Sequence, residues 1–166
     1  MNIHQVIHWM MATRFSLVLQ DWSVWLSPVC EIVHFVGLSL LVGAAGFMDL
    51  RLIGFFRSVP VRTALEFAPW AMVGFGMNLV SGFLFIWIDP SLYLASATFW
   101  AKILFLFVAA SNVVIFERTT LARRARLVGS NQETTRGMKL VGATSLISWF
   151  LVLFFGRMLP YLGQGY

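Results

Sequence analysis

Residues Pro28–Phe56 read PVCEIVHFVGLSLLVGAAGFMDLRLIGFF, a stretch long and apolar enough to cross a bilayer as an α-helix. Three more apolar stretches follow along the chain, at Phe67–Ile88, Thr98–Phe116 and Leu140–Leu162. In lipid the backbone must satisfy its own hydrogen bonds, so stretches of this length are expected to be helical. The sequence therefore predicts an all-α integral membrane protein, with a four-span bundle over residues 28–166.

The composition supports a membrane protein and excludes an ordinary soluble domain. Of the 166 residues, 59% are hydrophobic and only 11% are charged, whereas soluble domains carry about 25% charged residues. The net charge of +5 does not indicate nucleic acid as a partner, because most of it lies in two connections between spans. The single cysteine, Cys30, excludes an internal disulfide and a zinc site built on paired cysteines. We expect the lipid bilayer to be the main partner.

The basic residues predict the orientation of the bundle. Nine of the 12 lysines and arginines lie in or beside the first and third connections: Arg51, Arg57, Arg62, Arg118, Arg123, Arg124, Arg126, Arg136 and Lys139. The second connection, residues 89–97, has none. Basic loops stay in the cytoplasm, so this pattern predicts that both termini lie outside.

The first 27 residues form a separate segment that is too polar to span. Arg14, Gln20 and Asp21 interrupt it, and it contains three tryptophans, a residue enriched at membrane interfaces. We expect residues 1–27 to form an amphipathic helix, or two short ones, lying in the outer interface. Ser27 and Pro28 form a start signal for the first spanning helix.

Ionisable residues inside the spans are the strongest functional signal, because each costs about 2.5–3.5 kcal/mol at the bilayer centre. Helical spacing places Glu31, His34 and Asp49 within about 60° of one another on one face of the first span. We expect that face to look into the bundle. With both termini outside, Lys102 and Arg157 come to the same outer third of the membrane as Glu31 and His34, and the four predict a polar pocket.

Three interpretations of this pocket stay open at this point. The polar groups could simply satisfy one another, with Lys102 and Arg157 reaching toward the headgroups. Alternatively, His34 could ligate the iron of one b-type heme while Lys102 or Arg157 holds the propionates. One intramembrane histidine suits a single heme, with Lys102 or a methionine as sixth ligand. In the third interpretation the pocket binds another anion or handles protons.

A second candidate metal site lies near the N-terminus. His4 and His8 are four residues apart, so on a helix they share a face, and Met10 and Met11 follow closely. Imidazole and thioether groups suit copper, which predicts a copper site on the outer face. The competing interpretation is that both histidines are interfacial residues with no ligand.

Part of the chain resembles known membrane proteins. The stretches EIVHFVGL (residues 31–38), DLRL (49–52) and FWAKIL (99–104) resemble a family of uncharacterised four-span proteins of the bacterial inner membrane. They are more distantly similar to HemJ-type protoporphyrinogen oxidases and to the copper-resistance protein D group. In the HemJ-type proteins a histidine in the first span and a lysine opening a later span are associated with heme binding and activity. The resemblance therefore implies roles for His34 and Lys102, and a bacterial inner-membrane location.

The sequence leads to two functional hypotheses. The first is a membrane redox protein, such as an oxidoreductase, with one b-type heme near its outer face and a quinone as partner. The alternative is a non-enzymatic membrane subunit or carrier of small solutes or ions without a cofactor. Small residues occur on more than one face of the spans, which also favours a homodimer or a larger membrane complex.

Overall fold

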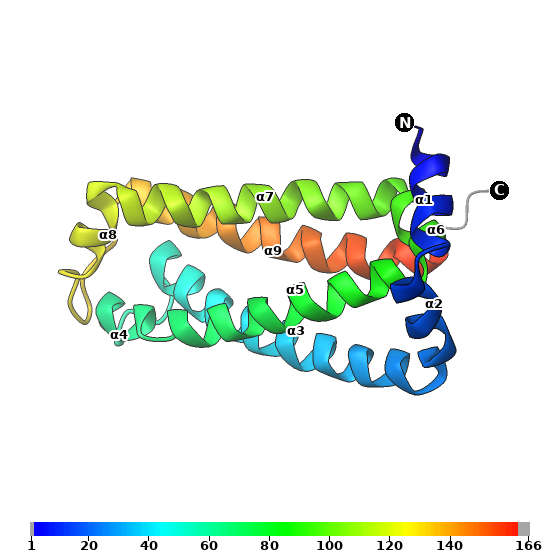
Figure 1. Ribbon diagram of the computed structural model, residues 1–166. Helices are drawn as coiled ribbons and strands as arrows, with labels where there is room; N and C mark the ends of the chain where they lie inside the picture. The colour runs from blue at the N-terminus through cyan, green and yellow to red at the C-terminus, as the bar shows by residue number, and fades with distance from the viewer. Residues whose placement is uncertain (1, 163–166) are drawn as a thin grey trace.

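The computed structural model describes residues 2–162, and that part of the chain is built from helices joined by short connections, with no strand, as predicted. The helices, drawn in Figure 1, have the following bounds: α1 Ile3–Met11, α2 Arg14–Asp21, α3 Ser23–Ile53, α4 Val61–Leu65, α5 Ala68–Ile88, α6 Pro90–Leu94, α7 Ala97–Arg118, α8 Thr120–Ala125 and α9 Arg136–Leu162. The all-α prediction is confirmed. Residues 1 and 163–166 lie outside the described part.

Four helical segments are long and apolar enough to cross a membrane: α3, α4 with α5 (Val61–Ile88), α7 and α9. The chain is therefore a multi-pass integral membrane protein. The first span begins at Ser23, five residues before the predicted proline start, and ends at Ile53. It ends there because Gly54 adopts φ 119°, a left-handed conformation that favours glycine, and donates its N–H to Leu50 O at 3.1 Å.

The spans are arranged as two helical hairpins joined along one seam. α3 packs on α5, α7 packs on α9, and α3 also packs on α9. Within the described residues α5 and α7 do not pack extensively on each other. α3 and α9 are therefore the central helices, and the two hairpins meet mainly through them.

The two ends of the bundle differ in charge and in content. α4 and α8 lie at one end, together with most of the basic residues, and α1, α2 and α6 lie at the other (Figure 1). The first and last described helices both reach this second end. By the preference of basic loops for the cytoplasm, we expect the α4–α8 end to face the cytoplasm, and we call it the cytoplasmic end and the α1–α2–α6 end the outer end.

α1 and α2 lie across the outer end rather than along the spans (Figure 1). Ser16 on α2 is fully buried and donates its hydroxyl to Trp87 O at 2.9 Å, near the end of α5. The rings of Trp9 and Phe15 contact the Trp87 ring. Trp9, Trp22 and Trp25 remain largely exposed, as expected for rings at headgroup level.

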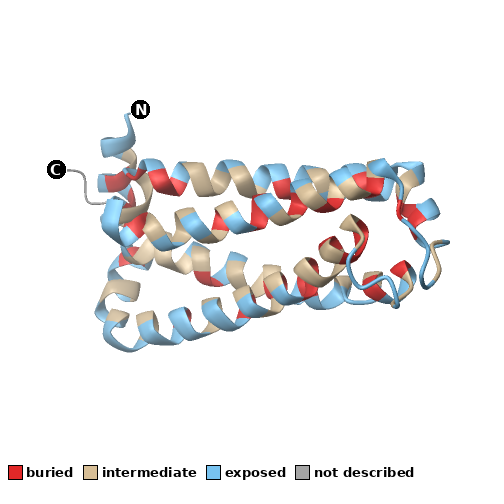
Figure 2. Cartoon of the chain, turned by 180° about the vertical axis from the view of Figure 1, so that it is seen from behind, coloured by how far each residue is buried: buried red, intermediate tan, exposed pale blue. Residues whose placement is uncertain are grey.

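The core has two apolar layers, and the outward faces of the spans are left exposed (Figure 2). The middle layer is built by the buried residues Leu41, Ala44, Ala45, Ala71, Ala109, Trp149 and Val152. The cytoplasmic layer is built by Leu52, Val61, Phe116, Ala122, Ala125 and Met138. Many exposed positions carry Val, Leu, Ile, Phe or Trp, which is the surface that lipid tails cover.

Glycines set the distance between α3 and α5. A Cβ built on Gly74 would lie 2.5 Å from Gly37 O, which is backbone and cannot move aside easily. Helices in lipid approach this closely only where residues are small. Gly74 and Gly37 therefore lie on the faces by which α5 and α3 meet. By contrast, Gly43 and Gly46 have open space beside them.

Candidate functional site

His34 lies in the outer half of α3 and faces α5. Its side chain is half-buried, and its Nδ1 lies 2.8 Å from the hydroxyl oxygen of Ser81, a buried residue of α5. The Phe85 ring stands edge-on to the imidazole at 5.6 Å between centroids, and Gly82 borders the ring's Cε1 side. The imidazole is therefore held between one polar contact and an apolar wall.

The hydrogen bonds of Ser81 relate to the tautomer of His34. The Ser81 hydroxyl lies 2.7 Å from Met77 O, an acceptor within its own helix. A hydroxyl has one hydrogen, so when it is donated to Met77 O its oxygen accepts from His34, and Nδ1 is then the protonated nitrogen. In the neutral imidazole Nε2 then keeps its lone pair. His34 is thus oriented as a ligand or a proton acceptor through Nε2.

Lys102 lies at the start of α7, on the other hairpin. It is half-buried, and its carbon chain and ammonium pass close to Gly156 of α9, within about 3.7 Å of where a Cβ would stand. Its positive charge acts on the His34 ring. Among the described residues Lys102 forms no salt bridge. His34 and Lys102 therefore lie on different hairpins, His34 against α5 and Lys102 against α9.

Glu31 and Arg157, the other predicted pocket residues, are both exposed. The prediction that Glu31 looks into the bundle is wrong, because its side chain is exposed at the outer end of α3. The Glu31 carboxylate instead acts on Tyr93 of α6. Burial, with the negative charges of Asp89 and Glu31, raises the pKa of Tyr93 to about 12. Arg157 places its guanidinium over the Tyr161 ring at 5.9 Å.

The candidate copper residues His4 and His8 are both exposed on α1. Within residues 2–162 no three His, Cys, Asp or Glu side chains gather closely enough to hold a metal ion. His4 and His8 would supply only two side-chain ligands from this part of the chain, and a copper site there stays a prediction.

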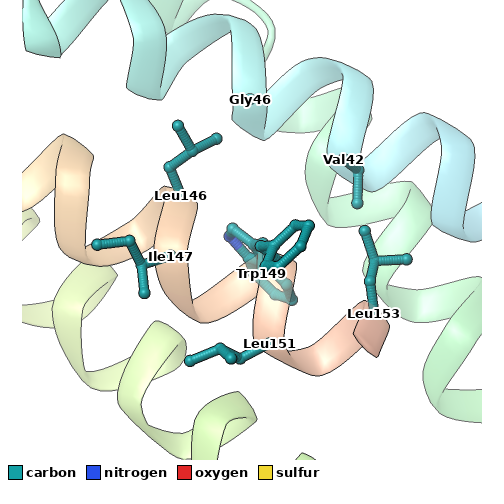
Figure 3. Close-up of a pocket in the computed structure, with 8 residues that line it drawn as sticks. Val42, Gly46, Leu146, Ile147, Trp149, Leu151 and Leu153 are labelled. Atoms are coloured by element: carbon teal, nitrogen blue, oxygen red, sulfur yellow. The ribbon is translucent and has the colours of Figure 1, made fainter. Parts of the chain in front are cut away.

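The cavities lined by described residues lie elsewhere in the bundle. A cavity of about 450 Å³ lies between α3 and α9, with Val42 and Gly46 on one side and Trp149 on the other (Figure 3). A second, of about 330 Å³, lies between α3 and α5 and is lined by Gly43, Phe47 and Trp70 among others. Neither is lined by His34 or Lys102. Both are almost wholly apolar, and lipid tails suit such walls.

A second group of polar residues lies at the cytoplasmic end and was only partly anticipated. Arg51 is fully buried. Its guanidinium donates to Val59 O, to Gly129 O at 3.2 Å and to Gln132 O at 3.4 Å. A guanidinium offers five N–H donors, so one side chain ties the end of α3 to the first and third connections. The sequence places Arg51 among the orienting charges and gives no sign of this burial.

Asp49 of α3 is also buried, with 6% of its surface exposed. Ser145 of α9 lies beside its carboxyl group as a hydrogen-bond partner, and its Oδ2 has no partner within the described residues. α9 comes this close because Gly142 has no side chain: a Cβ there would lie 2.7 Å from Asp49 O. The prediction that Asp49 faces into the bundle is confirmed.

Four spanning helices with intramembrane polar groups define the class of this chain as a multi-pass membrane protein. No protein-family model, curated protein or solved structure matches it.

Proposed function

We propose that this chain is a redox protein of the bacterial inner membrane that binds one b-type heme through His34, near the outer end of the bundle. The observation that carries the proposal is the orientation of His34. Histidines that ligate metals usually donate their other ring N–H to a fixed acceptor, which sets the tautomer and the ring position. The Ser81 hydroxyl supplies that acceptor at 2.8 Å.

Other residues of this site would suit the propionates and the ring edge of a porphyrin bound at His34. The Lys102 ammonium is a partly desolvated cation without an ion pair in residues 2–162, and a propionate carboxylate would satisfy it. Gly82 beside the imidazole and Gly156 beside Lys102 present no side chains. Because His34 and Lys102 belong to different hairpins, a group held by both would bridge them.

A heme bound there would supply one-electron chemistry, while the protein supplies binding, orientation and electrostatics. His34 would ligate the iron, and the apolar Phe85 ring would exclude water from the imidazole. Lys102 would hold negative charge at the site. We propose a membrane quinone as the electron partner, since the site lies within the span of the bilayer.

The visible spectrum of the purified full chain, expressed with added heme precursor, tests this proposal. We expect a Soret band that shifts on reduction by dithionite, and a similar change with an added quinol. His34→Ala should abolish the band at equal protein yield, whereas His8→Ala, on exposed α1, should leave it unchanged. A colourless, correctly folded protein, or a band that survives His34→Ala, would refute the proposal.

The alternative is a non-enzymatic membrane subunit or small-solute carrier, and one observation favours it. Several polar side chains in the spans bond backbone carbonyls of their own helix: Ser81 with Met77 O, Ser148 with Thr144 O, and Asn78 with Gly74 O. Such bonds satisfy polar groups that serve only helix packing. A protein without heme that co-purifies with a second membrane protein, or as a homodimer, would support this alternative.

A further inference from the structure

Asp49 places a carboxyl group inside a membrane-spanning helix, where burying its charge costs free energy. The proposed heme site gives this residue no role. Asp49 is on the membrane-spanning helix α3, four residues or about 6 Å before the helix end. It is about 22 Å along the helix from His34. The middle apolar layer, which includes Leu41, Ala44 and Ala45, lies between the two residues. The two polar groups are therefore separate.

The surroundings of Asp49 form a polar layer between two apolar ones. Besides Ser145, this layer contains Asn112 of α7, whose side chain donates to Val141 O of α9 at 3.0 Å. The middle apolar layer lies on the outer side, and the cytoplasmic apolar layer with Leu52 and Met138 lies on the other. An ionised carboxylate enclosed in this way pays a large desolvation cost unless a charge or hydrogen bonds compensate it.

No cation compensates Asp49 within the described residues. α5, which packs on α3, has no charged residue, and α4 contributes only the exposed Arg62. At the start of α9, Arg136 is exposed and Lys139 pairs with Glu133 at 4.0 Å. Arg51 directs its guanidinium to backbone carbonyls. Asp49 is left with one hydroxyl partner and a free Oδ2.

We propose that Asp49 is a proton-binding site in the cytoplasmic half of the membrane, which exchanges its proton with the cytoplasmic side. A bound proton neutralises the carboxyl group where no cation does so. On release, the proton passes to water, the electron pair stays on the carboxylate, and Ser145 stabilises the charge by donating its hydroxyl. Apolar layers lie on both sides of Asp49, but the cytoplasmic end of α3 is only one turn away, so the proton exchanges past the shorter barrier on that side.

A sodium site would need more oxygen ligands than this layer offers. Hard cations take about six oxygens, and the side-chain oxygens identified at Asp49 are its own carboxyl group and Ser145. Protonation needs only the carboxyl group itself. This argument concerns residues far from His34, so it stands whether or not the chain binds heme.

Labelling with a hydrophobic carbodiimide tests the proposal, because the reagent enters the bilayer and reacts with protonated carboxyl groups. The acid proton moves to a carbodiimide nitrogen, and the carboxylate oxygen bonds to the central carbon. With the full chain in lipid nanodiscs, mass spectrometry should locate the adduct on Asp49 near neutral pH. Labelling should fall as pH rises, and Asp49→Asn should abolish it.

Two serines one turn apart provide a test that does not depend on Asp49→Asn folding. Ser145→Ala removes the donor to the carboxylate and favours the protonated form, so labelling should persist to a pH higher by about one unit. Ser148 bonds Thr144 O within its own helix at 2.7 Å, so Ser148→Ala should leave the midpoint unchanged. In sealed vesicles, only the pH on the side of the basic loops should alter labelling.

Several outcomes would overturn the assignment. Labelling that does not change with pH, or no labelling of Asp49 at any pH, would show that the site does not exchange a proton. Equal effects of Ser145→Ala and Ser148→Ala would mean that the layer acts only in packing. Suppression of labelling by sodium at constant pH would identify a cation site instead. None of these outcomes bears on the heme spectrum, so the two proposals fail separately.

Discussion

The polar residues at the two ends of α3 differ in how far they are buried. Near the outer end His34 is half-buried, Ser81 fixes its Nδ1, and the neighbouring Glu31 is exposed. Near the cytoplasmic end Asp49 and Arg51 are almost completely enclosed, and each has a side-chain atom without a partner in the described residues. The outer group can reach a ligand, whereas the cytoplasmic groups belong to the interior of the protein.

The difference follows from what surrounds each end. Toward the outer end α3 lies apart from α9 (Figure 1), and its first turns pack on the short helix α2. The last turns lie against α9, α4 and the two basic connections, which close around them. We therefore expect changes at the cytoplasmic end to affect stability most, and changes at the outer end to affect chemistry.

The largest stability effect is expected from Arg51→Met. This change keeps the volume of the side chain but leaves the carbonyls of Val59, Gly129 and Gln132 without their donor. Unmade buried hydrogen bonds cost about 1–3 kcal/mol each, so we expect a loss of about 3 kcal/mol or more, measured by denaturant unfolding in detergent. Arg62→Met, at an exposed position of α4, is the control. Equal losses in both variants would show that Arg51 does not tie the connections together.

A smaller effect is expected where α3 crosses α5. Gly74→Ala places a Cβ against the backbone of Gly37, and overpacking of this kind costs about 1–3 kcal/mol. Gly76, two residues along the same helix, has nothing within 4 Å of a Cβ. Gly76→Ala should therefore be neutral, or stabilising by up to about 1 kcal/mol from helix propensity. Thermal unfolding of the pair measures the difference, and a Gly74→Ala protein as stable as Gly76→Ala would contradict the observed approach.

The smallest effect concerns Tyr93 at the outer end. Asp89→Asn removes one of the charges that raise its pKa to about 12, so the pKa should fall toward the usual value of about 10. Absorbance of the tyrosinate measures it, in a background carrying Tyr161→Phe and Tyr166→Phe. Because the folded state favours neutral Tyr93, its contribution to stability is present below about pH 10 and is lost as pH rises toward 12. An unchanged pKa would mean that Asp89 does not contribute and that burial and Glu31 raise it.

Much of the architecture could be predicted from the sequence. Apolar length marks the spans, and the small residues Gly74 and Asn78 mark the face of α5 that meets α3. These features recur at regular spacing along the chain, so they can be recognised in the sequence alone. The exact ends of the helices differ from the prediction: α3 starts at Ser23, five residues before the predicted proline start.

The candidate site was predictable only in part. The positions of His34 and Lys102 in the outer third follow from chain order and orientation. Helical periodicity placed Glu31 and Asp49 on one face, but it could not tell that the first is exposed and the second buried. That depends on which neighbour covers each turn of α3, and neighbours come from distant parts of the chain.

By itself, the amino-acid order determined that this protein crosses the membrane four times with its basic connections on one side. The length and apolarity of each span and the charge of each connection are local properties of the sequence, and these properties decide how a helix sits in lipid. Only the tertiary structure decided that Ser81 hydrogen-bonds His34, that Arg51 joins two connections, and that Ser145 meets Asp49. Each of these contacts joins residues far apart in sequence, and a hydrogen bond depends on distance and direction that local patterns do not contain.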